Sequence, residues 1–315
     1  MGSLLLIFDV LTDAPDAQAL AGVTFAAQLQ QFATVNALYI CHSYQASGAW
    51  LRMGADAALI YNADAPLCAH QMEAVITAAV AATGADWIAA CSPGTLQDAI
   101  ARAAAVMSMP LIRDVCGVAV GNAGELTVER RIYSGEFIAT LQVPPRCAFT
   151  IHPPAFSQSV ETQLTANITE LSVAVPSSRV TVERPAQSAD KRPALSQAKV
   201  VVAGGNPLKD AATFESLIGT LADCLGGAAG ATRAAVDAGV ASAELQIGQT
   251  GSRIAPQLYI AAGVSGSIQH MAGIRDAQTI IAINTDAQAP IFKHADFGIC
   301  ADLYRILPEL IAKLK

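Results

Sequence analysis

The sequence predicts an α/β protein of two domains, and three observations support this prediction. The chain has 315 residues, and a single hydrophobic core rarely grows much beyond about 250 residues. Short apolar runs alternate with helical stretches in both halves, which is typical of parallel sheets covered by helices. A stretch rich in Pro, Ser and charged residues, 182–199, separates the two series. We therefore expect one domain over residues 1–190 and a second over residues 196–315.

The first half begins with the elements of a largely parallel sheet. Buried strands are expected at Leu4–Val10, Val35–Cys41, Ala57–Tyr61 and Trp87–Cys91, with helices over Ala17–Phe32, 66–84 and 95–107. From Leu111 onward, β-rich runs follow one another without helices, at Leu126–Ile132, Phe137–Val143 and Cys147–Ile151, with turns at 122–124 and 134–135. This succession indicates antiparallel strands added to the parallel sheet.

The second half restarts with a strand over 199–203 that ends in Gly204-Gly205. The elements that follow are a helix over Ala211–Leu225, strands at Ala228–Ala231, Gln257–Ala262 and Thr279–Asn284, and a last helix over Leu303–Leu314. This order of strands and helices indicates a compact Rossmann-like domain.

Composition argues against several classes of partner and site. The net charge is −7 and no basic cluster occurs, so we expect no nucleic acid as a partner. The longest apolar stretch, Ala74–Ala85, is too short to span a membrane, so no membrane insertion is expected. The seven cysteines are scattered without a Cys-x-x-Cys pair, and no secretory signal opens the chain. We therefore expect reduced thiols, no metal site and a cytoplasmic protein.

Four loops of the second half share one design, in which an apolar strand ends and small or hydroxyl residues follow. They are Gly204-Gly205, Gly230–Arg233, Gly263–Ser267 and Ala282–Asp286. The strand ends of a parallel sheet meet at one edge, where small residues let the backbone approach a ligand and helix N-termini offer N–H groups to phosphate. Each loop alone is better explained as a tight turn or a helix cap. Four of them in one domain indicate a bound dinucleotide.

Several polar side chains near these loops have alternative explanations. Arg233 follows an expected helix cap, where a cation opposes the helix dipole, so an anionic or π-rich partner is expected. A surface pair with Asp237, one turn later, explains Arg233 equally well. His270 lies on an apolar helix face, where a lone histidine is more often a hydrogen-bonded core residue than a functional one. Gln249-Thr250 and Asn284 would ordinarily be polar turns.

The second half resembles the C-terminal domain of electron transfer flavoprotein alpha subunits. Three runs carry the resemblance in the same order and spacing, namely TRAAVDAG (Thr232–Gly239), QIGQTG (Gln246–Gly251) and the long run Leu258–Leu310 that begins LYIAAGVSGSIQHMAG. The first half is similar chiefly through ERRIYSGEFIATLQV, Glu129–Val143. The resemblance implies an N-terminal α/β domain, an FAD-binding domain and a separate beta subunit that completes the complex.

The resemblance also implies roles for individual residues. It places Arg233 over the isoalloxazine ring, Gln249 beside the ring, Thr250 near N5 and His270 near O2. A guanidinium and an imidazole there would favour the negative charge that reduction adds to the flavin. Ser265, Gly266 and Gln269 are implied along the ribityl and pyrophosphate path, and Asn284 and Asp302 at the adenosine end. The full set of expected FAD-binding residues is Thr232, Arg233, Gln249, Thr250, Gly263, Ser265, Gly266, Ser267, Gln269, His270, Asn284 and Asp302.

The chain departs from the family pattern at two places. Family members usually carry Gly-Gly-Arg-Gly after the first strand of the FAD-binding domain, and that arginine helps to bind the FAD phosphate. Here the run is Gly204-Gly205-Asn206-Pro207, so a cationic contact is lost and proline stiffens the loop. Lys209 is the candidate replacement. In the first half, Ile151-His152-Pro153 stands where many relatives carry an arginine.

These inferences lead us to expect an electron carrier rather than an enzyme, with no catalytic residue. FAD would take electrons from flavoprotein dehydrogenases and pass them to an acceptor oxidoreductase, in a heterodimer with an electron transfer flavoprotein beta subunit. Whether the complex bifurcates electrons depends on that subunit. Two alternatives stay open. One is a flavin-poor, nucleotide-binding structural subunit, which Asn206-Pro207 allows. The other is an NAD(P)-dependent dehydrogenase, although the first βα loop lacks the G-x-G-x-x-G fingerprint.

Overall fold

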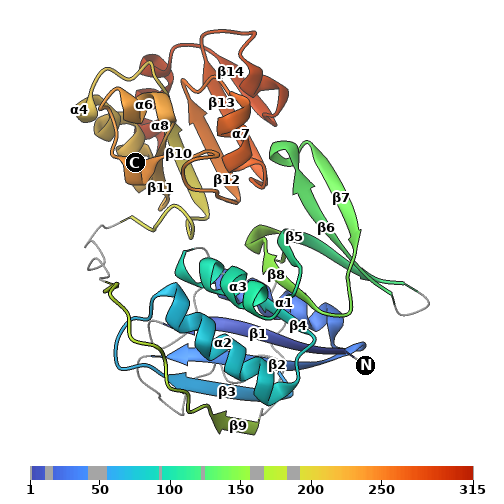
Figure 1. Ribbon diagram of the computed structural model, residues 1–315. Coiled ribbons are helices and arrows are strands. Elements are labelled where there is room, and N and C mark those ends of the chain that lie inside the picture. The colour runs from blue at the N-terminus through green and yellow to red at the C-terminus, as the bar shows by residue number, and fades with distance from the viewer. Residues whose placement is uncertain are drawn as a thin grey trace. The chain divides into compact units, whose positions relative to one another are not determined.

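The computed structural model describes residues 2–10, 17–41, 55–91, 94–121, 125–156, 167–182 and 192–314. The chain forms two compact units, Met1–Ile132 with Glu136–Pro185, and Ala186–Lys315 with Tyr133–Gly135 (Figure 1). Half of the expected linker, residues 183–191, and the expected turn at 122–124 lie outside the described residues. Within the described ranges, every helix is too short or too polar to cross a bilayer.

A nine-stranded sheet forms the centre of the N-terminal unit (Figure 1). Its strands, in spatial order, are β7 (Phe137–Gln142), β6 (Leu126–Ile132), β5 (Leu111–Val120), β8 (Cys147–Ile151), β4 (Trp87–Ala90), β1 (Gly2–Val10), β2 (Ala33–Cys41), β3 (Ala57–Asn62) and β9 (Asn167–Glu170). All neighbours from β5 to β9 are parallel, and β6 and β7 add antiparallel pairs at one edge. The predicted largely parallel sheet with added antiparallel strands is confirmed.

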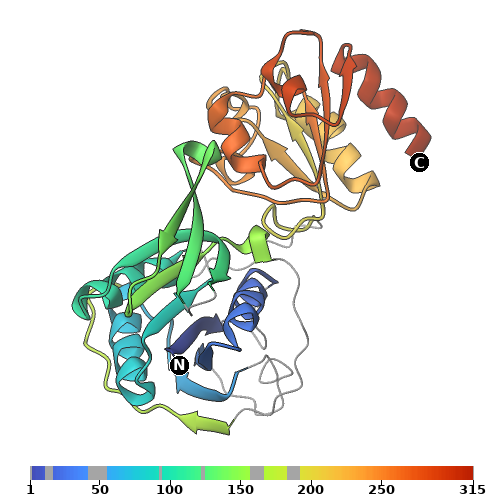
Figure 2. The same cartoon turned by 90° about the vertical axis from the view of Figure 1, so that its right-hand side faces the viewer.

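One strand of this sheet differs from its predicted direction. Cys147–Ile151 was expected to be antiparallel, but β8 pairs in parallel with both β4 and β5. All five of its residues are buried, as is usual for a strand inside a parallel sheet with both faces covered. The chain therefore returns from the β6–β7 hairpin into the middle of the sheet. Figure 2 shows that hairpin at one edge and β9 at the other.

Helices α1 (Ala17–Leu29), α2 (Ala69–Thr83) and α3 (Thr95–Val106) cover the two faces of the sheet. The alternation of side chains along β1 decides which face each residue joins. Leu4 and Leu6 pack with Phe25 of α1, whereas Leu5 and Ile7 join the core formed with α2 and α3. The sheet is thus buried on both sides, which explains why its strands are nearly continuous apolar runs.

The chain after β9 stays attached to α2. Leu171, Val173 and Val175 pack against the core beneath this helix at every second position. Gln71 at the start of α2 donates from Nε2 to the carbonyl of Pro176 at 3.0 Å. The segment up to Pro176 therefore belongs to the N-terminal unit, so the connection between the units begins only beyond it.

A five-stranded parallel sheet forms the C-terminal unit (Figure 1). Its strands, in spatial order, are β11 (Ala228–Ala231), β10 (Val200–Gly204), β12 (Leu258–Ala262), β13 (Thr279–Asn284) and β14 (Phe297–Cys300). The helices are α4 (Ala211–Phe214), α5 (Thr220–Cys224), α6 (Arg233–Asp237), α7 (Ile268–Ile274) and α8 (Leu303–Leu314). One face packs on α4, α5 and α8, and the other on α7. The predicted Rossmann-like arrangement is confirmed, although a π-helical turn at Glu215–Gly219 interrupts the helix expected over 211–225.

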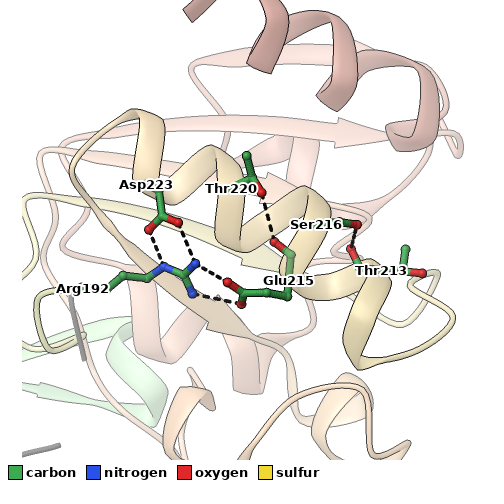
Figure 3. Close-up of polar contacts among 6 residues, drawn as sticks. All are labelled: Arg192, Thr213, Glu215, Ser216, Thr220 and Asp223. Atoms are coloured by element: carbon green, nitrogen blue, oxygen red, sulfur yellow. Dashed lines mark hydrogen bonds and ion pairs between the residues drawn. The ribbon is translucent and has the colours of Figure 1, made fainter. Parts of the chain in front are cut away.

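Arg192 is the first described residue after the linker, and it is clamped by two carboxylates (Figure 3). Its Nε and Nη2 donate to Asp223 at 2.7 and 2.9 Å, and its Nη1 donates to Glu215 at 3.0 Å. Nη2 pairs with Glu215 as well. A Cβ on Gly219 would come within 2.7 Å of Nη2, so glycine leaves room for the guanidinium. The carboxylates raise the pKa of Arg192, and the guanidinium lowers the pKa of Glu215.

We expect the substitution Arg192→Met to lower the free energy of unfolding of this unit by about 1 kcal/mol near neutral pH, the upper range for exposed ion pairs. Because the pKa of Glu215 is lower in the folded state, this stabilisation is present above its unfolded value and is lost as pH falls through the folded one. Wild type and variant should therefore converge once the pH falls below the folded-state pKa of Glu215. Urea unfolding of wild type and variant across this pH range measures both the loss in free energy of unfolding and its dependence on pH. Arg305→Met removes a single exposed pair with Glu309 and is the control. If Arg192→Met and Arg305→Met lowered the free energy of unfolding equally, the two carboxylates around Arg192 would stabilise the unit no more than a single exposed pair does.

Candidate cofactor-binding site

The order in which the chain adds strands to the C-terminal sheet reverses between β10 and β12, although all strands stay parallel. From β10 the chain moves to β11 on one side, and it later enters β12 on the other side. The loops after β10 and β12 lead to helices on opposite faces, and ligands bind beside such a reversal in open parallel sheets. Gly205 donates its N–H to the carbonyl of Ala262 at 3.0 Å. A Cβ on Gly205 would lie 1.9 Å from the carbonyl oxygen of Gly263, so only glycine permits this approach.

The loop from β12 to α7 makes a tight turn through two glycines. Gly263 and Gly266 have φ angles of +66° and +81°, which other residues rarely adopt. A Cβ on Gly266 would lie 2.5 Å from the backbone nitrogen of Ile291, whose N–H donates to the carbonyl of Ser265 at 3.0 Å. Ser267 caps α7, and its hydroxyl accepts a helix N–H at 3.4 Å. The turn leaves the side chains of Ser265 and Ser267 exposed at this sheet edge.

The segment 246–252 lies against the start of α7. The backbone N–H of Gln249 donates to the carbonyl of Gln269 at 2.8 Å. Gln246 donates from Nε2 to the hydroxyl of Thr250 at 3.1 Å. The side chains of Gln249, Thr250 and Gln269 are all exposed. The structure thus brings three of the predicted residues together from two separate parts of the sequence.

His270 is the most deeply buried polar residue of the predicted set, with 5% of its surface exposed. Its Nε2 lies 2.7 Å from the hydroxyl of Tyr259 on β12. Among the described residues its Nδ1 is covered by the chain and has no side-chain or backbone group at ideal hydrogen-bond geometry, although the backbone of Ile247 acts on the ring and favours its protonated form. Burial lowers the pKa of His270 to about 4, so the ring is neutral near pH 7. Burial raises the pKa of Tyr259, so the phenol keeps its proton.

Thr232 and Arg233 begin α6 at the end of β11. The hydroxyl of Thr232 accepts from the N–H of Ala235 at 3.3 Å, which confirms it as the helix cap. The Nε of Arg233 lies 3.3 Å from an Asp237 oxygen, and these side chains are 69% and 65% exposed. The structure therefore contains the surface pair that the spacing allowed. An exposed i,i+4 pair contributes about 0.3–0.5 kcal/mol, which a bound anion would readily outweigh.

Asn284 is the last residue of β13, and Asp302 follows β14. Asn284 donates from Nδ2 to the carbonyl of Val264 at 3.0 Å and so ties β13 to the loop after β12. Its Oδ1 accepts from the N–H of Asp286 at 3.0 Å. Asp302 begins α8, where its Oδ1 accepts from the N–H of Tyr304 at 2.9 Å. The predicted residues thus extend along the carboxyl ends of the strands from β11 to β14.

Two tyrosines outside the predicted set position this edge. Tyr259 contacts His270, and the hydroxyl of Tyr304 donates to the carbonyl of Pro207 at 2.9 Å. The ammonium of Lys209 lies 5.5 Å from the centre of the Tyr304 ring. The Asn206-Pro207 loop is therefore held in place beside its own cation. Tyr259 could have been noticed in the sequence, because it carries the only polar side chain of the strand LYIAA.

The residues of this edge fit an FAD. A dinucleotide needs close backbone approach at its pyrophosphate and polar donors along its length. At Gly205, Gly263 and Gly266 the backbone of this edge carries no side chain, and a side chain at each would collide with a neighbouring atom of the chain itself. The exposed serine, threonine and amide side chains offer the second. Among the described residues, no cluster of three metal-binding side chains occurs.

An open parallel sheet with this edge defines a dinucleotide-binding protein, and comparisons with known proteins identify its family. A model of the "Electron transfer flavoprotein FAD-binding domain" matches residues 194–275, and a model of the "Electron transfer flavoprotein domain" matches residues 14–157. The electron transfer flavoprotein subunit alpha of Paracoccus denitrificans is 36% identical over 263 residues, which cover 82% of this chain and 83% of that protein. The chain belongs to the electron transfer flavoprotein alpha subunit family. The predicted family and the predicted cofactor, FAD, are confirmed.

Two fungal relatives align over a smaller part of their length. A probable electron transfer flavoprotein subunit alpha of Cryptococcus neoformans is 39% identical over 222 residues, covering 68% of this chain and 62% of that protein. The corresponding protein of Saccharomyces cerevisiae is 44% identical over 206 residues, covering 64% and 60%. The chain thus spans less than two thirds of these two relatives.

The predicted cytoplasmic location is wrong. The names of both fungal relatives describe them as mitochondrial. The prediction rested on the absence of a secretory signal and on scattered cysteines. Neither feature distinguishes the cytoplasm from another reducing compartment, because both report only on the secretory route and on disulfides.

Proposed function

We propose that this chain is the FAD-carrying alpha subunit of an electron transfer flavoprotein, an electron carrier rather than an enzyme. It forms a heterodimer with a beta subunit, accepts electrons from flavoprotein dehydrogenases and passes them to an acceptor oxidoreductase. Family membership and the match to an FAD-binding domain support this proposal. In it, residues 196–315 bind FAD, and residues 1–190 serve as a scaffold and contact the partner.

The observation that carries the proposal is the row of polar groups along the carboxyl edge of the C-terminal sheet. The glycines at 205 and 266 let the loops of this edge pack closely, because a Cβ would lie 1.9 Å from the carbonyl oxygen of Gly263 in one case and 2.5 Å from the backbone nitrogen of Ile291 in the other. We infer that the pyrophosphate binds beside these turns. Bound FAD supplies reversible one-electron chemistry. The residues that would hold it are Thr232, Arg233, Gln249, Thr250, Gly263, Ser265, Gly266, Ser267, Gln269, His270, Asn284 and Asp302.

Arg233 and His270 would tune the cofactor by different means. Arg233 brings a full positive charge, which the exposed pair with Asp237 restrains only weakly. His270 brings a hydrogen-bonding nitrogen without a charge, because burial keeps its pKa near 4. Reduction adds negative charge to a flavin, so both groups would favour the reduced cofactor, and Arg233 more strongly.

The first βα loop weighs against the dehydrogenase alternative. A dinucleotide fingerprint of the NAD type needs three glycines, and the run after β10 is Gly204-Gly205-Asn206-Pro207. Pro207 has no N–H to offer a phosphate, and its carbonyl is bound by Tyr304. In this chain Lys209, beside the Tyr304 ring, is the basic residue of that loop and would take the role of phosphate cation.

The test is co-expression with the beta subunit, followed by native mass measurement and an absorbance spectrum of the purified complex. We expect a complex that contains both chains and shows flavin absorbance, with one FAD for each alpha chain. A stable homodimer that binds FAD fully would contradict the partner assignment. A colourless complex that still binds nucleotide would favour the flavin-poor structural subunit. Direct reduction by a nicotinamide cofactor coupled to a small substrate would favour the dehydrogenase.

A further inference from the structure

The loop after β10, residues 205–209, is held at its start but only weakly within itself. The N–H of Gly205 is bonded to the end of β12, and the side chain of Leu208 is buried. Within the loop, the N–H of Leu208 donates to the carbonyl of Gly205 over a long 3.4 Å. The three remaining residues are exposed. A short exposed segment with few bonds of its own opens at a small cost in free energy, so its arrangement depends on contacts from outside.

Tyr304 supplies such a contact from the start of α8, 97 residues further along the chain. Its hydroxyl donates to the carbonyl of Pro207 at 2.9 Å. Its backbone N–H donates to the side chain of Asp302 at 2.9 Å, which fixes the residue in the first turn of the helix. Gly263 leaves room for this contact, because a Cβ there would lie 3.0 Å from the Pro207 ring and 2.7 Å from the side chain of Leu303. The loops after β10 and β12 therefore meet the start of α8 at one point.

The ring of Tyr304 also lies beside Lys209, the basic residue of the loop. The ammonium is 5.5 Å from the ring centre, close enough to be attracted to the face of the ring. Among the residues that the structure describes, Lys209 forms no ion pair. An ammonium has three N–H donors, so the group keeps donors for an anion while it lies against the ring. The loop lies beside the reversal of strand order, where ligands bind in open parallel sheets.

We propose that Tyr304 is a positioning residue for the phosphate-binding loop: it holds the Pro207 carbonyl and the Lys209 ammonium in one arrangement, so that a phosphate of FAD meets a fixed cation. The inference rests on the proposed function of the chain. Tyr304 needs no contact with FAD, because it acts through the loop. Its hydroxyl fixes the backbone and its ring fixes the charge. A loop that is ordered before the cofactor arrives reduces the ordering that binding must otherwise bring about.

The variant Tyr304→Phe removes the hydroxyl and keeps the ring beside Lys209. In the complex with the beta subunit, we expect the dissociation constant for FAD to rise roughly 2- to 12-fold, the loss of one hydrogen bond. In the FAD-free complex, we expect faster hydrogen exchange at the N–H of Leu208, because the loop opens more often. Tyr61→Phe, on a strand of the other unit, is the control and should change neither quantity. Unchanged affinity or unchanged exchange in Tyr304→Phe would refute the role.

The variant Lys209→Gln shows whether Tyr304 acts through the ammonium. On its own it should weaken FAD binding and make the affinity less dependent on salt, because salt screens a contact between a charge and a phosphate. Tyr304→Phe should also reduce the salt dependence. In the Lys209→Gln background, Tyr304→Phe should weaken binding by less than about 2-fold further, since the two changes disturb one interaction. Equal effects of Tyr304→Phe in both backgrounds, or a salt dependence that neither variant alters, would overturn the proposal. A wild-type complex that lacks FAD would instead refute the proposed function.

Discussion

Substituting alanine for Gly266 is expected to destabilise the C-terminal unit by about 2–5 kcal/mol and to weaken FAD binding about tenfold or more. Gly266 has a φ of +81°, and left-handed backbone costs other residues about 1–2 kcal/mol. The added Cβ would lie 2.5 Å from the backbone nitrogen of Ile291, and overpacking against backbone adds about 1–3 kcal/mol. Moving Ile291 would also break its hydrogen bond to Ser265, so the loop that is proposed to meet the cofactor would shift.

Gly239→Ala is the matched control for this effect. Gly239 lies in the same unit and has a φ of +72°, but a Cβ there would meet no atom within 4 Å. It should therefore show the backbone strain alone, about 1–2 kcal/mol, with FAD affinity unchanged. Urea unfolding and FAD titration by fluorescence measure the two quantities. Equal destabilisation of both variants, with FAD retained in both, would show that the approach to Ile291 is unimportant.

Replacing Arg233 with alanine is expected to lower the first one-electron potential of bound FAD by about 60–170 mV. Two unit charges 4 Å apart interact by about 4 kcal/mol at an effective dielectric near 20. Solvent screening and the delocalised flavin charge should reduce this to about 1.4–4 kcal/mol, and about 59 mV corresponds to 1.4 kcal/mol for one electron. His270→Ala should lower the potential less, because a neutral imidazole contributes a hydrogen bond and no full charge.

Spectroelectrochemical titration measures these potentials, and Asp237→Asn is the control. That variant removes the surface partner of Arg233 but keeps the arginine, so the potential should stay the same or rise. An Arg233→Ala protein that binds FAD at an unchanged potential would mean that Arg233 serves only the surface pair. The placement of the flavin ring beside α6 would then be wrong.

Much of the fold was predictable because its strands are long, apolar and local. The runs that predicted strands at Val35–Cys41 and Thr279–Asn284 lie within the observed β2 and β13. Two short strands, β9 and β14, were not predicted. Every residue of both is exposed. β9 is largely polar and shows no apolar pattern, whereas β14 is an apolar run of only four residues, too short to distinguish a strand from a turn. Their strand conformation depends on pairing with β3 and β13, which local sequence does not show.

The candidate site was predictable only as a set of loops. Small residues after apolar strands indicated the edge of the sheet, since strand ends of a parallel sheet always gather there. Which loops touch could not be predicted. The contact of Gly205 with Gly263 and the bond between Gln249 and Gln269 join residues far apart in the chain, through backbone atoms that are the same for every sequence. The pairing of Arg233 with Asp237 was predictable, because one helical turn separates them.

The sequence by itself determined the class of this protein, a two-unit α/β chain with a dinucleotide edge, because apolar periodicity and glycine turns act over a few residues. Only the tertiary structure decided the state of its buried groups. Tyr259 meets His270 because β12 and α7 pack face to face, and Arg192 reaches Glu215 and Asp223 because a π turn and Gly219 leave room for it. A side chain's charge and proton position depend on burial and on partners brought from elsewhere in the chain.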